Sequence, residues 1–124
     1  MSIDINGEIT VADLDKPDVH TSTATGTGLD ISSYEGKIKV TLICGTVGGT
    51  SPTNACKIQD SADDSTYADV TGATFTTVTA SNSNESIAVD TRGVNKYIRS
   101  VQTIGGTSPT FDSVVVTAGI KKVR

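Results

Sequence analysis

The sequence predicts an all-β protein, an antiparallel β-sandwich of about seven to eight short strands. Segments rich in β-branched residues alternate with turn-forming segments at a spacing of roughly ten residues, which is typical of sandwiches and barrels. No segment shows a convincing helical period. A hydrophobic content of 35% and the absence of Trp predict a thin core of Val, Ile, Leu and Ala.

The chain divides into an N-terminal arm, residues 1–28, and a β-sandwich domain, residues 29–124. The arm scatters a few apolar residues among acidic ones and then runs through a Thr/Ser/Gly stretch with too little apolar surface to pack by itself. Two interpretations are open, a frayed tail and an extended arm that becomes ordered on a neighbouring subunit. The apolar residues favour the second.

The domain is predicted to centre on a β-hairpin. Residues 38–44 and 54–60 alternate apolar and polar side chains on either side of a loop of Gly, Thr, Ser and Pro. A symmetric register places Cys44 opposite Cys56. This pairing would allow a disulfide outside the reducing cytoplasm, although directly paired strand positions often lack the required Cβ geometry.

The remaining strands follow at intervals along the chain. They are predicted at residues 67–70, 74–79, 85–90, 97–104 and 111–120. The hairpin loop, GGTSPT at residues 48–53, is repeated letter for letter at residues 105–110, which is 57 residues later. The repeat indicates either an internal duplication of a hairpin or the same loop sequence recurring because two hairpins share one geometry.

No motif predicts catalysis, a metal site or a cofactor. His20 is the only histidine, and we expect it to be solvated in a low-complexity region, so the serines and threonines have no evident activating base. Two cysteines and one remote histidine fall short of a zinc site. Asp60, Asp63 and Asp64 crowd one turn, with Asp69 near. This group lacks the spacing of a calcium loop, and we expect it to cap the turn instead.

Charge and hydropathy argue against two classes of partner. With a net charge of −4, the chain is poorly suited to neutralise phosphates, so neither nucleic acid nor an anionic lipid surface is expected as a partner. No apolar run approaches the ~20 residues of a membrane span. The first residues are acidic and lack the basic and apolar regions of a signal peptide, so we expect synthesis in a cytoplasm.

Three phrases resemble small structural proteins encoded in the head-gene region of tailed bacteriophages. They are LDISSYEGK at residues 29–37, KIQDSADDSTYADV at residues 57–70, and YIR at residues 97–99 together with GGTSPTF at residues 105–111. The resemblance covers about three quarters of the chain. The phrases are structural rather than catalytic.

The resemblance implies a jelly-roll-like, non-enzymatic subunit that decorates a phage capsid as a cement protein. Such a protein would sit on the capsid exterior of the virion, bridge neighbouring capsomers and be made in the host cytoplasm. Its partners would be the major capsid protein and further copies of itself, as a dimer or trimer. The predicted contact residues lie in the arm and the two repeats: Ile3, Ile5, Ile9, Val11, Gly48, Gly49, Thr50, Ser51, Pro52, Gly105, Gly106, Thr107, Ser108 and Pro109.

Two other functions stay open. Residues 58–67 resemble the strand-and-turn pattern of discoidin-like sandwiches, which favours a carbohydrate-binding adhesion module on the virion. The absence of Trp counts against that interpretation. The other alternative is a tail or head–tail connector component, which would form a ring of fixed symmetry.

Overall fold

The computed structural model describes residues 9–121 and confirms an all-β fold. The described residues form seven antiparallel strands in one sheet and contain no helix that could span a membrane. The strands are β1 (Ile9–His20), β2 (Ala24–Thr25), β3 (Leu29–Asp30), β4 (Tyr34–Ser61), β5 (Ala68–Thr74), β6 (Ser83–Asp90) and β7 (Tyr97–Lys121).

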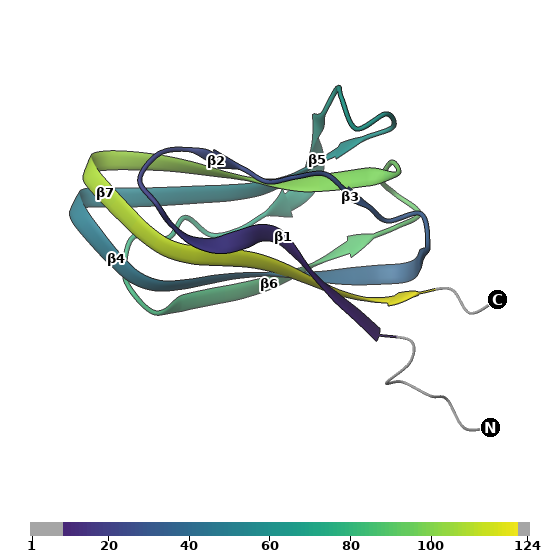
Figure 1. Ribbon diagram of the computed structural model, residues 1–124, viewed down its shortest axis with the longest axis horizontal. Helices are drawn as coiled ribbons and strands as arrows, with labels where there is room; N and C mark the ends of the chain where they lie inside the picture. Colours follow the sequence, from purple (N-terminus) through teal and green to yellow (C-terminus); the bar gives the residue numbers. More distant parts are fainter. Residues whose placement is uncertain (1–8, 122–124) are drawn as a thin grey trace.

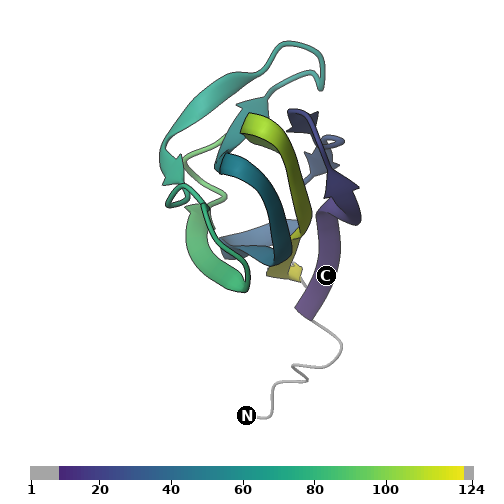
Figure 2. The ribbon, with the colours of Figure 1, turned by 90° about the vertical axis from the view of Figure 1, so that its left-hand side faces the viewer.

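Two long strands, β4 and β7, organise the molecule. They pair with each other over their whole length, and both bend sharply at the GGTSPT segments (Figures 1 and 2). Each strand therefore has two legs. The first and second legs of β4 are residues 34–47 and 54–61, and those of β7 are residues 97–104 and 111–121.

The bends fold the single sheet into a two-layer sandwich (Figure 2). One layer contains, in order, β1, the second leg of β7, the first leg of β4, and β6. The other contains β2 and β3, then the first leg of β7, the second leg of β4, and β5. With each leg counted as a strand, this alternation between layers is the jelly-roll order.

The core lies between the layers and is built by strict alternation along the strands. The first leg of β4 turns every second side chain inward, and the second leg of β7 does the same. The fully buried large side chains include Phe111, Leu14, Ile38, Leu42, Ile58 and Ile98. The core is therefore aliphatic, with few aromatic residues, as the composition predicted.

The predicted central hairpin is wrong. Residues 38–44 and 54–60 are the two legs of one bent strand, and they lie in opposite layers. Cys44 pairs with Ser113, and Cys56 pairs with Gln102. Each leg finds its antiparallel neighbour in β7 because the second repeat bends β7 at the same place. The strands that carry the fold are consequently long rather than short.

Residues 9–28 of the predicted arm are part of this sandwich. β1 pairs with the second leg of β7 of the same chain, and Leu14 is only 1% exposed. β2 pairs with the first leg of β7. Residues 1–8 lie outside the described residues. Residues 75–79, predicted to be strand, instead form a connection that is held by one isolated bridge between Asn54 and Val78.

Candidate functional site

The two GGTSPT segments lie side by side at the closed end of the sandwich, at the left of Figure 1. We call this pair of segments the bend. Its register is symmetric, because equivalent positions of the two repeats exchange partners: Gly48↔Thr110, Thr50↔Thr107 and Thr53↔Gly105. The repeat in the sequence is therefore a local two-fold axis in the structure.

The backbone at the bend adopts conformations that few residues accept. Gly49 and Gly106 have φ angles of 102° and 110°, and Ser51 and Ser108 have φ angles of 49° and 48°. A Cβ atom on Gly49 would lie 2.6 Å from the carbonyl oxygen of Ser108, and one on Gly106 would lie 2.7 Å from that of Ser51. The two segments thus pack backbone against backbone, and each fixes the other.

The outer surface of the bend is uncharged. Neither repeat contains an ionisable side chain, and both expose the glycine, threonine and serine at their tips. Such a surface can be buried against another protein without desolvating an ion. Because the backbone is already fixed, little conformational entropy would be lost on binding. The bend is therefore suited to docking.

A buried polar network lies behind the bend and joins the two layers. Gln102 is its centre: its side-chain oxygen accepts hydrogen bonds from Asn54 Nδ2 and Ser113 Oγ, both at 2.8 Å. Its Nε2 donates to Asp15 Oδ2, also at 2.8 Å. Asn54, Gln102 and Ser113 are fully buried. The network ties both legs of β7, the second leg of β4 and β1 together.

His20 is not the solvated residue that the sequence predicted. Its side chain is only 10% exposed, and Nε2 lies 3.8 Å from Asp15 Oδ2. The imidazole is held because β1 continues to His20, which pairs with Phe111. The arrangement does not form a nucleophile with its base, since the buried Ser113 hydroxyl donates to an amide oxygen and not to the imidazole. His20 and Asp15 both belong to β1, so this contact lies within one strand.

Both cysteines are free thiols and are buried. They are not opposite each other on neighbouring strands, as the predicted hairpin required, because Cys44 is opposite Ser113 and Cys56 is opposite Gln102. Burial raises the pKa of the Cys56 thiol to about 12, and the nearby Asp15 and Cys44 add to the rise. Burial also raises the pKa of Cys44. Neither thiol is therefore activated as a nucleophile, because nucleophilic cysteines have lowered pKa values.

Raising the pH should destabilise the protein through these thiols. Cys56 keeps its proton in the folded state up to about pH 12, whereas in the unfolded chain it loses the proton near pH 9. Its contribution is fully present below pH 9 and is lost as the pH rises toward 12. Urea unfolding between pH 8 and 10.5 should show a falling free energy, with a shallower fall in Cys56→Ala. Equal slopes in the two proteins would contradict this assignment.

The acidic turn after β4 caps itself, as predicted. The Asp63 carboxylate accepts hydrogen bonds from the backbone N–H groups of Ser65 and Thr66 and from Ser61 Oγ. These bonds, that from Thr66 first, lower the pKa of Asp63. Asp69 instead accepts from Gln59 Nε2 and Lys57 Nζ on β4. The carboxylates are thus used to hold the turn and the edge of the sheet.

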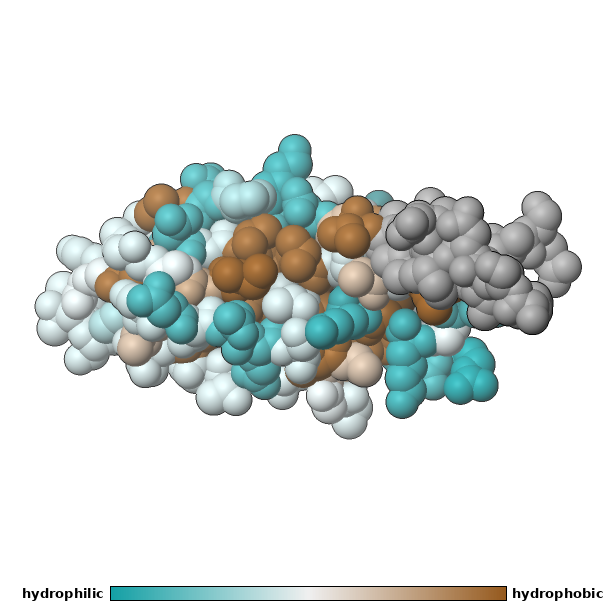
Figure 3. Space-filling view, turned by 90° about the horizontal axis from the view of Figure 1, so that it is seen from below, coloured by the Kyte–Doolittle hydropathy of each residue, from teal (hydrophilic) through white to brown (hydrophobic). Residues whose placement is uncertain are grey.

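The predicted contact residues fall into two separate places. The two repeats meet at the bend, whereas Ile9 opens β1 at the far end, opposite Ile120. Val11 is 67% exposed and lies on the outer face of its layer, where Figure 3 shows hydrophobic residues gathered. Ile3 and Ile5 lie outside the described residues. Among the described residues, the predicted arm positions and the repeats therefore do not form one continuous contact site.

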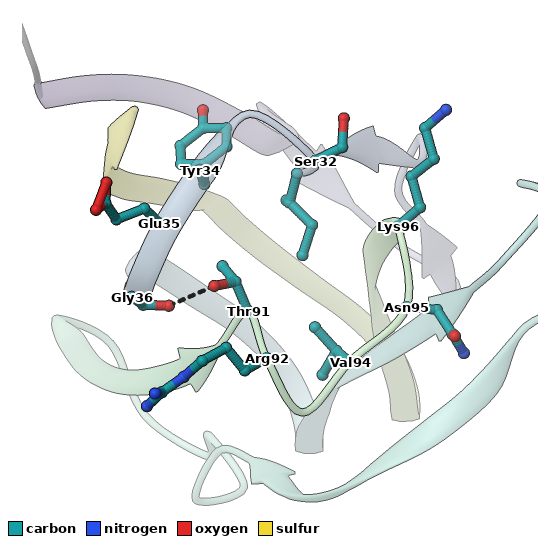
Figure 4. Close-up of a pocket in the computed structure, with 10 residues that line it drawn as sticks. Ser32, Tyr34, Glu35, Gly36, Thr91, Arg92, Val94, Asn95 and Lys96 are labelled. Atoms are coloured by element: carbon teal, nitrogen blue, oxygen red, sulfur yellow. Dashed lines mark hydrogen bonds between the residues drawn. The ribbon is translucent and has the colours of Figure 1, made fainter. Parts of the chain in front are cut away.

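A hollow of about 830 Å³ lies at the open end of the sandwich (Figure 4). Ile31 and Val94 supply apolar walls, and the charged side chains of Glu35, Arg92 and Lys96 lie around its rim. A hydrogen bond of 2.7 Å from Thr91 Oγ1 to the carbonyl oxygen of Gly36 holds one side. Lys96 Nζ lies 3.8 Å from Asp30 Oδ2, so the positive charge of Lys96 is balanced by a neighbouring carboxylate.

Sequence reasoning missed the polar network. Asn54 and Gln102 occupy inward positions of their strands, in register with apolar neighbours that point the same way. A polar residue at an inward position of an alternating strand is the signal that could have identified each of them. Their mutual contact depends on the bend and on the pairing of distant legs, which local alternation does not show.

A scan against protein-family models found no match, and a search of the curated proteins found none either.

Proposed function

We propose that this protein is a non-enzymatic structural protein of a phage virion, which decorates the capsid and stabilises it by bridging neighbouring capsomers. The resemblance of the sequence from Leu29 onward to phage head-region proteins supports the class. The observation that carries the mode of action is the bend, in which two identical uncharged segments form one rigid, exposed tip. We propose that the bend contacts the major capsid protein.

The physical role follows from the place at which a capsid under internal pressure fails. A capsid filled with DNA fails where neighbouring capsomers separate, so a protein that spans the junction adds buried area to the weakest contact. One such contact contributes little, but many identical copies act together and make the shell hard to open. A long β-sandwich with a rigid docking end is suited to this use, because it transmits force without deforming.

Paired substitutions at the bend should weaken capsid binding. In Thr50→Glu/Thr107→Glu, two carboxylates would have to be desolvated at the contact, and we expect the affinity for capsids to fall by about tenfold or more. Thr71→Glu/Thr74→Glu places the same two charges on exposed positions of β5 and should bind like the wild type. Both proteins should keep the wild-type circular dichroism spectrum. The thermal midpoint of the bend variant should fall by only a few degrees, because the two carboxylates face each other across the strands and repel by less than about 1 kcal/mol.

The measurement uses purified protein and phage capsids that lack it, with occupancy read by cryo-electron microscopy and capsid stability read by thermal release of DNA. We expect ordered density between capsomers and a higher release temperature. Failure of the wild-type protein to bind would overturn the proposal and favour the sugar-binding or connector alternatives. Equal binding by the bend variant and the control would exclude the bend as the contact.

A further inference from the structure

The outer face of the layer formed by β1, β7, β4 and β6 carries a band of apolar side chains. We call this band the apolar stripe. The register puts its members on one face, since Val11 pairs with Ala118, and Ile43 with Val114. The stripe consists of Val11, Ile43, Val114, Val116, Ala118 and Ile120. Figure 3 shows hydrophobic residues gathered in the middle of this face, with hydrophilic residues around them.

Exposed apolar surface is concentrated on this layer. The exposed large hydrophobic residues of the described chain are Val11, Val19, Ile43 and Ile120, with exposed fractions of 67%, 54%, 41% and 43%. All four belong to β1, the first leg of β4 or the second leg of β7, and none belongs to the other layer. A gathered patch of this kind marks an interaction surface, whereas scattered apolar residues do not.

The second leg of β7 has the pattern of a strand that is covered on both sides. Val115 points into the core and is fully buried, while Val114 and Val116 point outward and are half-buried. A strand that faces water on one side normally alternates apolar and polar residues. The outward valines therefore indicate that something covers this face.

Charge identifies the occupant as a second copy of the same chain. Asp13 pairs with Val116 and lies on the β1 side of the stripe, while Lys39 pairs with Ala118 and lies on the β4 side. Neither forms an ion pair with another described residue. A two-fold axis parallel to β7 lays β1 of each copy over β4 of the other. Asp13 of each copy then lies over Thr41 of its partner, because both residues pair with Val116, and Lys39 is two residues along the same strand. The long Lys39 side chain can reach the Asp13 carboxylate from there, twice in one interface.

We propose that two copies of this chain pack face to face through the apolar stripe, with the second legs of β7 at the centre and reciprocal Asp13–Lys39 pairs at the sides. Such an isologous interface closes on itself and leaves the bend of each copy exposed. It also matches the usual anatomy of protein interfaces, with an apolar centre and a polar rim. The inference does not depend on the proposed capsid function.

Sedimentation equilibrium of the full chain over a range of concentrations tests the surface. We expect a monomer–dimer equilibrium, with the dimer dissociation constant raised about tenfold or more by Ile43→Lys. Ala62→Lys puts the same charge on an exposed turn outside the stripe and should leave the constant unchanged. A wild-type monomer at all concentrations, a trimer, or a dimer that tolerates Ile43→Lys would each overturn the proposal.

Charge reversal tests the two-fold arrangement itself. Asp13→Lys and Lys39→Asp should each weaken the dimer, because each sets like charges against one another across the interface. The double variant exchanges the charges and should restore the wild-type constant. A double variant no tighter than the single variants would overturn the Asp13–Lys39 pairing. No capsid enters either measurement, so a negative result leaves the capsid proposal standing.

Discussion

Replacing Gln102 with methionine is expected to lower the free energy of unfolding by on the order of 3 kcal/mol. Methionine has nearly the volume and shape of glutamine, so little of this loss would come from a cavity. The loss arises because Asn54 Nδ2 and Ser113 Oγ lose the oxygen to which they donate, and Asp15 loses a donor. The Asn54 and Ser113 donors would then be buried without an acceptor, and the partly buried Asp15 carboxylate would lose a donor.

Urea unfolding followed by far-ultraviolet circular dichroism measures this loss. Thr103→Val is the matched control, since Thr103 is the next residue of the same strand but is exposed. A surface substitution of this kind should change the free energy of unfolding by less than about 0.5 kcal/mol. If Gln102→Met were no more destabilising than Thr103→Val, the network would not be the brace between layers that we describe.

A second substitution separates the hydrogen bonds from the charge of Asp15. In Asp15→Asn the side-chain oxygen can still accept from Gln102 Nε2, so the network keeps its geometry while the partly buried charge is removed. We therefore expect Asp15→Asn to be much less destabilising than Asp15→Leu, which leaves the Gln102 amide without an acceptor. Comparable losses would mean that the charge, and not the hydrogen bond, holds β1 to the layer.

The fold class could be predicted from the sequence because it depends on local signals. Turn-forming residues at regular intervals and alternation within each strand are properties of neighbouring residues. The alternation of residues 38–44 and 54–60 was predicted for the same reason, and its apolar positions Val40, Cys44, Cys56 and Ile58 are buried. Alternation survives even when the partner strand is misassigned, since it reports only which face is covered.

The pairing of strands could not be predicted in this way. Residues 38–44 have the same alternation whether they pair with residues 54–60 or with the second leg of β7. The choice is made by the bend, where the two repeats contact each other across 57 residues of sequence. The identity of the repeats was visible, but their mutual packing is a tertiary contact. The network around Gln102 and the environment of His20 follow from that contact and were missed with it.

Gly49→Ala and Gly106→Ala are expected to destabilise the protein by about 2–4 kcal/mol each. Two costs combine at each position. The positive φ angle disfavours any residue with a Cβ atom, which costs roughly 1 kcal/mol. The new methyl group would also lie 2.6 Å or 2.7 Å from a carbonyl oxygen of the facing repeat, so the two segments would have to move apart.

Gly72→Ala separates these two costs. Gly72 also has a positive φ angle, 81°, but a Cβ atom there would have nothing within 4 Å. We therefore expect Gly72→Ala to cost only about 1 kcal/mol, the conformational part alone. The excess at Gly49 and Gly106, measured by urea unfolding, then reports the backbone-to-backbone packing of the bend. Because the repeats exchange equivalent contacts, the two excesses should agree within about 0.5 kcal/mol. Equal effects at all three glycines would show that the repeats do not fix each other, and the rigidity on which docking at the bend depends would be lost.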